Sequence, residues 1–206
     1  MIAIVDYGVG NLFSLCASLR HLGAVCLVTG DEATLRAADR IILPGVGAFG
    51  DAMRKLRETG LIPALDAQVR EGKPLLGICL GMQLLFERSA EYGECAGLSY
   101  IPGSVDPLAP DLPPALLVPH IGWNALQILD ADEPLLRYIR AGDCVYYVHS
   151  YYVKTRGDFV KADAEYGIRV PGVVRHGNVA GTQFHPEKSG AVGLSILRAF
   201  AEGGGK

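Results

Sequence analysis

Cys79 lies between Gly77 and Gly81, where an apolar run over residues 74–78 meets an amphipathic stretch over residues 82–88. This order predicts a strand, a sharp turn that carries the thiol, and a helix, an arrangement that can expose a nucleophile. A side chain at either glycine would crowd such a turn. The first N–H groups of the helix would favour the thiolate, so the segment predicts a nucleophilic cysteine. The alternative is a buried cysteine that packs as a small apolar side chain.

His185 and Glu187 can supply the base and the orienting acceptor that a nucleophile needs. They are separated by Pro186, which disfavours a helix and predicts an extended segment in which the two side chains share a face. Taken singly, His185 is more often a surface or core histidine, and Glu187 is more often a solvated carboxylate. Together with Cys79, in that chain order, they predict a catalytic triad.

These motifs resemble those of the class I, or triad, glutamine amidotransferases. The chain reads Gly-Ile-Cys-Leu-Gly-Met-Gln over residues 77–83 and His-Pro-Glu over residues 185–187. Four more segments resemble one branch of this family, the glutaminase subunits of imidazole glycerol phosphate synthase in histidine biosynthesis. They are residues 6–11, 44–49, 119–124 and 148–152. The resemblance covers nearly the whole chain, and the last two segments are the ones that narrow it to this branch.

The resemblance implies an enzyme that hydrolyses glutamine through a glutamyl thioester on Cys79, with His185 as proton carrier and Glu187 as its orienting group. The ammonia would pass through a closed passage to a cyclase subunit, a (βα)8 barrel, within a heterodimer. That subunit would use it to form imidazole glycerol phosphate and aminoimidazole carboxamide ribotide. No cofactor or metal is implied, and the sequence has no phosphate-binding Gly-x-x-x-x-Gly-Lys-Ser/Thr loop.

The glycine-rich segment over residues 44–47 follows an apolar strand and can present N–H groups to an oxyanion. The backbone N–H groups of Leu80 and of Val46 or Gly47 are the candidates, although a simple turn is equally compatible with the sequence alone. The resemblance implies that a peptide of this loop can flip to complete the oxyanion hole. We therefore expect low glutaminase activity until a partner binds.

Gln83 lies four residues beyond the cysteine, so its side chain can face the same pocket as the thiol. The resemblance implies that the glutamine pocket is lined by Gly47, Gln83, His149, Ser150 and Tyr151. Ordinary strand packing is the alternative for the tyrosine, since aromatic side chains are common in strands.

Trp123 is the only tryptophan, and tryptophan is enriched at the centres of protein interfaces. The alternative is a core tryptophan that anchors a loop. The resemblance places Asn11, Trp123 and Lys188 at the interface with the synthase subunit.

Composition limits the other functions. The 206 residues are 50% hydrophobic and 20% charged with a net charge of −3, which is typical of a globular protein. The sequence has no basic run that would indicate a nucleic-acid surface and no apolar stretch of the ~20 residues that a membrane helix needs. The five cysteines include no Cys-x-x-Cys pair, and the N-terminus does not read as a signal peptide. We expect reduced thiols and a cytoplasmic location.

Strands alternate with helices in the first half, which predicts an α/β fold with a mostly parallel central sheet flanked by helices. The expected strands are residues 2–6, 25–28, 41–43 and 75–78, and the expected helices are 11–22, 32–37 with Asp31 as cap, 49–58 and 61–71. Later strands, at 116–118, 125–128, 145–148, 159–164, 173–174 and 179–184, predict an antiparallel extension of that sheet, with helices at 134–139 and 191–201. We expect one domain over residues 1–206, with a frayed tail at 203–206.

Three other functions fit parts of this pattern. The first is a glutaminase that serves another synthase, for nucleotides, aminobenzoate or a cofactor. The second is a cysteine peptidase on a related α/β fold, which would need no glutamine. The third is a regulatory subunit that kept the fold without the chemistry, which the intact triad residues disfavour.

Overall fold

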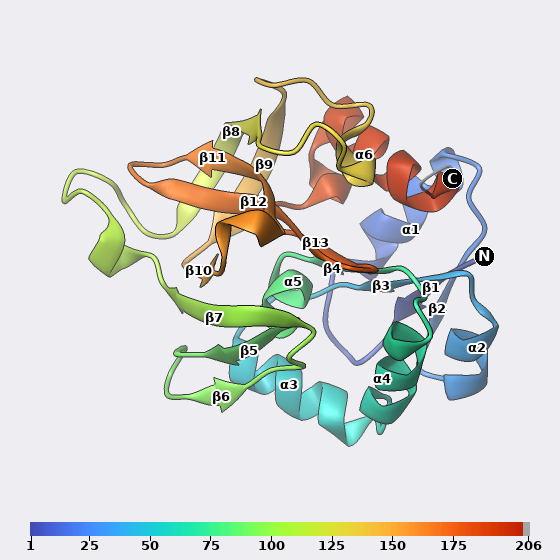
Figure 1. Cartoon of the computed structure of the whole chain (residues 1–206). Helices are drawn as coiled ribbons and strands as arrows, with labels where there is room; N and C mark the ends of the chain where they lie inside the picture. The colour runs from blue at the N-terminus through green and yellow to red at the C-terminus, as the bar shows by residue number, and fades with distance from the viewer. Residues whose placement is uncertain (204–206) are drawn as a thin grey trace.

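The computed structural model describes residues 1–203, and in this part of the chain the central sheet has nine strands (Figure 1). Their order is β2-β1-β3-β4-β13-β12-β11-β8-β9. Pairing is parallel from β2 to β13 and antiparallel from β13 to β9. The strands are β1 (Ile2–Val5), β2 (Cys26–Thr29), β3 (Arg40–Leu43), β4 (Leu75–Ile78), β8 (His120–Ile128), β9 (Cys144–His149), β11 (Val160–Glu165), β12 (Arg169–His176) and β13 (Val179–Thr182). The predicted α/β fold with an antiparallel extension is confirmed.

Helices cover both faces of the parallel half (Figure 1). This explains why β1, β4 and β13 are buried at every residue, as expected for parallel strands covered on both sides. Side chains of α1 and α6 belong to one of the two large buried clusters, and those of α2, α3, α4 and α5 belong to the other. The helices are α1 (Leu12–His21), α2 (Glu32–Ala37), α3 (Phe49–Glu58), α4 (Ile62–Arg70), α5 (Leu80–Leu84) and α6 (Gly190–Glu202).

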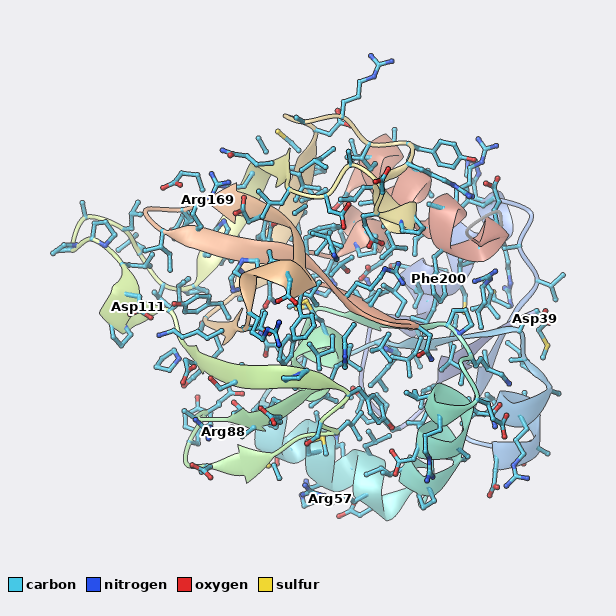
Figure 2. The ribbon with its side chains drawn as sticks, in the orientation of Figure 1. Asp39, Arg57, Arg88, Asp111, Arg169 and Phe200 are labelled. Atoms are coloured by element: carbon cyan, nitrogen blue, oxygen red, sulfur yellow. The ribbon has the colours of Figure 1, made fainter. Side chains whose placement is uncertain are left out.

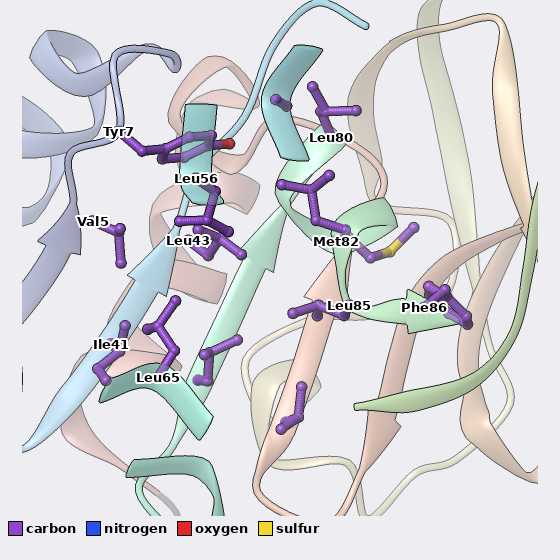
Figure 3. Close-up of a cluster of buried hydrophobic side chains, with 14 of the residues drawn as sticks. Val5, Tyr7, Ile41, Leu43, Leu56, Leu65, Leu80, Met82, Leu85 and Phe86 are labelled. Atoms are coloured by element: carbon purple, nitrogen blue, oxygen red, sulfur yellow. The ribbon is translucent and has the colours of Figure 1, made fainter. Parts of the chain in front are cut away.

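The cluster between α3, α4, α5 and the sheet fixes the short helix α5 (Figure 3). Met82 of α5 is fully buried and packs so closely on β13 that a Cβ on Gly181 would lie 2.3 Å from its Cγ. Leu80, at the start of α5, is also buried in this cluster. Close packing of this kind leaves α5 little freedom to shift relative to the sheet.

A second sheet of four strands, in the order β10-β7-β5-β6, lies beside α3 and α5 (Figure 1). Its strands are β5 (Phe86–Ser89), β6 (Cys95–Ala96), β7 (Ile101–Pro107) and β10 (Tyr151–Lys154), and short 3-10 segments are η1 (Ala109–Asp111), η2 (Pro134–Leu136), η3 (Gly157–Phe159) and η4 (Pro186–Lys188). The hydroxyl of Tyr152 donates to Asp111, labelled in Figure 2, over 2.8 Å. This bond ties β10 to η1.

Several predicted elements are confirmed at both ends: α2, α3 and β4 have the expected bounds. Asp31 caps α2 as expected, because the N–H of Thr34 donates to its carboxylate over 2.8 Å. The helix expected over 82–88 is wrong in its second half. Phe86 is fully buried and pairs with Ile101, so the chain turns into β5.

Other expectations also fail. Residues 116–118 form no strand, and the helix expected at 134–139 is only the 3-10 segment η2. The antiparallel extension does not stay in one sheet, because β10 pairs with β7 in the second sheet. Residues 204–206 of the expected frayed tail lie outside the described residues. Gly203 is held, since its carbonyl accepts from Arg137 Nη1 over 2.6 Å.

Candidate active site

Cys79 occupies a strained turn between β4 and α5. Its φ of +54° and ψ of −111° lie in a region that residues other than glycine rarely adopt, and this backbone strain costs about 1–3 kcal/mol. Its N–H donates to Thr182 of β13 over 2.7 Å. A Cβ on Gly77 would lie 2.7 Å from Met82 N, and one on Gly81 would lie 1.9 Å from the carbonyl oxygen of Leu43. The predicted elbow, and the reason for its two glycines, are confirmed.

His185 and Glu187 meet directly after β13. The Nδ1 atom of His185 donates to Oε1 of Glu187 over 2.8 Å, and both side chains are 3% exposed. Pro186 begins the 3-10 turn η4, so the two side chains meet across a turn. The extended segment predicted from the sequence is therefore wrong, although the pairing it was meant to explain is present.

The imidazole of His185 lines the same cavity as the thiol of Cys79 and is bonded to the Glu187 carboxylate. Burial by itself lowers the pKa of His185, but the interactions of the ring with Cys79 and Glu187 outweigh burial and raise that pKa to about 10. A proton on this ring is therefore held strongly between a sulfur and a carboxylate. The three groups have the relation of nucleophile, base and orienting acceptor.

A cavity of about 420 Å³ opens over the thiol. Ten of its lining residues are ones that the sequence singled out: Val46, Gly47, Cys79, Leu80, Gln83, His149, Ser150, Tyr151, His185 and Lys188. Glu187 lies behind His185, beside a smaller cavity. Three more residues line the large cavity: Glu91, which the sequence did not single out, and Pro119 and Val148, which lie in singled-out segments but were not assigned to the pocket.

Comparison with known proteins agrees with this geometry. The sequence profile of glutamine amidotransferase class-I matches residues 3–202. The chain belongs to the class I glutamine amidotransferase family.

Similar curated proteins are named imidazole glycerol phosphate synthase subunit HisH. That of Bacillus cereus (strain AH187) is 48% identical over 200 residues, which cover 97% of this chain and 93% of that protein. That of Caldanaerobacter subterraneus subsp. tengcongensis is 48% identical over 203 residues, which cover 98% of each.

Solved structures share the fold of this amidotransferase at low sequence identity. A crystal structure described as glutamine amidotransferase aligns with a TM-score of 0.75 at 20% identity, covering 98% of both chains. PurLQS from Thermotoga maritima aligns with a TM-score of 0.74 at 18% identity, covering 98% of this chain and 97% of that one.

The glycine-rich loop of the amidotransferase, between β3 and α3, is held at both ends. At its start, the buried hydroxyl of Tyr7 donates to the carbonyl of Pro44 over 2.6 Å. At its end, the N–H of Phe49 donates to the Glu91 carboxylate over 2.6 Å. Between these anchors Val46 is 41% exposed and Gly47 has a φ of +94°. The part of the loop with the expected oxyanion donors is therefore the part that can change its backbone.

Gln83 is buried and connects two walls of the pocket. Its side-chain nitrogen donates to the carbonyl of Tyr151 over 3.0 Å and to Oε1 of Gln183 over 3.1 Å. Gln183 in turn points its own nitrogen at the sulfur of Cys79, 3.8 Å away. Gln183 was missed as a site residue. The sequence could have indicated it, because Gln183 lies two residues before His185 and the two side chains share a face of an extended chain.

The three residues expected at the interface differ in their exposure and contacts. Asn11 is half-buried, and its amide donates to Oε1 of Glu187 over 3.3 Å, so its side chain supports the triad. Trp123 is 56% exposed on β8, and its ring meets Tyr146 edge-on. Lys188 is exposed at the rim of the cavity.

Within residues 1–203, no group of three or more histidine, cysteine or acidic side chains is arranged to hold a metal ion. None of the helices in this range combines the length and hydropathy needed to cross a membrane.

Proposed function

We propose that this chain hydrolyses glutamine to glutamate and ammonia, with Cys79 as nucleophile. The observation that carries the proposal is a cysteine on a strained elbow that shares one cavity with a buried histidine, whose ring is bonded to a carboxylate over 2.8 Å. His185 is the proton carrier and Glu187 its orienting group. Each residue takes the role that the triad geometry gives it.

In the first half of the reaction, the sulfur of Cys79 attacks the side-chain carbonyl carbon of glutamine, and His185 holds the thiol proton. The tetrahedral intermediate then collapses, the C–N bond breaks and His185 gives its proton to the leaving nitrogen. Ammonia departs and a glutamyl thioester remains. In the second half, water loses a proton to His185 and attacks the thioester, which releases glutamate and returns the proton to the sulfur.

The negative oxygen of both tetrahedral intermediates needs donors. We assign the N–H of Leu80, the first residue of α5, and that of Val46 or Gly47 on the anchored loop. Because Val46 and Gly47 lie between two fixed ends, a local peptide rotation can add or remove the second donor. This supports the expectation that glutaminase activity stays low until a partner binds.

The remaining lining residues suit the amino-acid end of glutamine. Gly47, Gln83, His149, Ser150 and Tyr151 line the proposed pocket. Glu91 places a carboxylate in the same cavity and suits the α-ammonium group.

We further propose that the chain works as the glutaminase subunit of imidazole glycerol phosphate synthase, in a heterodimer with a (βα)8-barrel cyclase subunit in the cytoplasm. The 48% identity to proteins named as a subunit of that synthase supports this. Ammonia from Cys79 would pass to the cyclase, which forms imidazole glycerol phosphate and aminoimidazole carboxamide ribotide. Asn11, Trp123 and Lys188 stay the proposed interface residues. The two large buried clusters each draw on distant parts of the chain, which supports one domain over residues 1–206.

Two assays test these proposals. Glutamate release from glutamine should require Cys79 and vanish in C79A, and unchanged release by that variant would overturn the assigned nucleophile. Co-purification with the cyclase should yield a glutamine-dependent synthase. In C79S the synthase should lose its use of glutamine and keep its use of free ammonia, and loss of both would argue against directional transfer.

A further inference from the structure

A buried histidine outside the triad connects β8 to the pocket. His120 is fully buried, and its ring is stacked between the rings of Tyr147 and Tyr166, with centroid distances of 4.7 and 4.0 Å. Its Nδ1 atom lies 2.9 Å from Nε2 of His149, the residue directly across from it on β9. His149 lines the glutamine cavity, and His120 does not.

The hydrogen bonds fix which nitrogens carry protons. The carbonyl of Tyr151 can only accept, so Nδ1 of His149, 2.9 Å away, is its donor. Burial, and next the charge of His120, lower the pKa of His149 to about 3, so this ring is neutral and its Nε2 is an acceptor. Nδ1 of His120 must therefore donate to it. The link runs in one direction, from His120 to His149 to the carbonyl of Tyr151.

The same chain of bonds continues to the nucleophile. The Tyr151 carbonyl also accepts from Gln83, Gln83 donates to Gln183, and the amide nitrogen of Gln183 points at the sulfur of Cys79. Turning either amide over would place two acceptors or two donors face to face. Because the Tyr151 carbonyl is held from two sides, by His149 and by Gln83, weakening the His120–His149 bond lets this carbonyl shift and loosens Gln83 together with the Gln183 donor behind it.

On its other side, His120 is linked to the exposed strand β8. Its Nε2 lies 2.8 Å from Oδ1 of Asn124, whose amide nitrogen donates to the carbonyl of Glu165. A neutral His120 that donates from Nδ1 has no proton for this contact, and turning Asn124 over would set its Oδ1 against the Glu165 carbonyl. The neutral ring therefore keeps the buried bond to His149 and gives up this more exposed contact. Burial lowers the pKa of His120, against the effect of Asn124. The bond to His149 needs only the proton on Nδ1 and is kept in both states.

We propose that His120 is a positioning residue for the attack by Cys79, acting through His149, the Tyr151 carbonyl, Gln83 and Gln183. A donor held at the sulfur favours the thiolate, so losing the proton on Nδ1 of His120 loosens that donor and slows the thiol's reactions. Only the effect on glutamine turnover depends on the proposed function. Reaction of Cys79 with an alkylating agent does not require glutamine to be the substrate.

The test compares two substitutions of His120 whose side-chain amides occupy the positions of different ring nitrogens. In H120N the amide can stand near the position of Nδ1 and still donate to His149, whereas in H120Q it reaches toward Nε2 and loses that bond. We expect the iodoacetamide alkylation rate of Cys79 in the full chain, followed by peptide mass spectrometry at neutral pH, to fall about three- to tenfold in H120Q and to stay within about twofold in H120N. Y166F, which loses the 2.8 Å bond to the Leu117 carbonyl beside the same ring, is the matched control and should react like the wild type.

Equal alkylation rates for folded H120N and H120Q, whether both slow or both unchanged, would overturn the proposal. A measurement on the wild type keeps it testable if H120Q fails to fold. Long-range 1H–15N NMR spectra of the imidazole nitrogens should show His149 and His120 both protonated at Nδ1. A His120 protonated only at Nε2 would contradict the direction of the chain and reject the proposal.

Discussion

Replacing Glu187 with glutamine removes one charge and changes no volume, which makes it the sharpest probe of the triad. The bond from His185 Nδ1 to Glu187 Oε1 is 2.8 Å long and both side chains are 3% exposed, so solvent cannot replace it. A hydrogen bond with a charged partner contributes about 1.5–3 kcal/mol, which corresponds to about a 10- to 150-fold loss of rate. We therefore expect E187Q to lower kcat for glutamine by at least about tenfold.

The loss should also show in the proton carrier itself. Glu187 is one of the two groups that raise the pKa of His185 to about 10, so E187Q should bring that pKa back toward the ordinary value of about 6.5. NMR titration of the His185 ring in both proteins measures this directly. N11A is the matched control, because it removes only a 3.3 Å bond to the same oxygen and should reduce kcat less than E187Q does.

The assay is glutamate formation from glutamine, measured with saturating cyclase partner and at several glutamine concentrations. Circular dichroism and thermal unfolding establish that each variant is folded. An E187Q protein that is folded and turns over glutamine within twofold of the wild type would refute the role given to Glu187. A kcat for N11A lower than that of E187Q would refute the ranking of the two contacts.

Three further predictions concern stability and assembly. Because the pKa of His185 is raised in the folded protein, its pair with Glu187 stabilises the fold fully below about pH 6.5 and loses this effect as pH rises toward 10. The difference in urea unfolding free energy between wild type and E187Q should therefore shrink from pH 6.5 to pH 10. A difference that stays constant would contradict this prediction. In the same measurement, G81A should destabilise the fold by more than about 3 kcal/mol, because its Cβ would lie 1.9 Å from the Leu43 carbonyl oxygen. The control is G50A in α3, whose Cβ would have no neighbour within 4 Å and which should be neutral or stabilising. Equal effects of the two substitutions would contradict the elbow geometry. W123A should raise the Kd for the cyclase about 10- to 100-fold by titration calorimetry, and L129A, exposed beyond the far end of β8, should not; the reverse order would move the interface elsewhere.

The sequence was most informative where local rules decide the structure. Asp31 as a cap, the helix over residues 49–58 and the glycines around Cys79 each depend on neighbours within a few residues, and each prediction was confirmed. The fold class also followed from local order, since alternating strands and helices leave few arrangements of a sheet.

The sequence was less informative where contacts between distant segments decide the structure. Residues 86–88 belong to the amphipathic stretch that predicted a helix over 82–88, and only pairing with β7 makes them part of a strand. Gln183, Glu91 and His120 entered the site, or its support, through contacts with residues 29 to 104 positions away. The spacing between His185 and Glu187 suggested their contact but not the 3-10 turn that makes it.

The central claim is that the sulfur of Cys79 bonds covalently to glutamine. The direct measurement is rapid acid quenching of the chain with its cyclase partner and glutamine, followed by mass spectrometry of the cysteine peptides. A glutamyl thioester on the Cys79 peptide that builds up before glutamate appears, and is absent from C79A, is the predicted result. Full glutamate production with no adduct in the wild type, together with turnover by C79A, would contradict it.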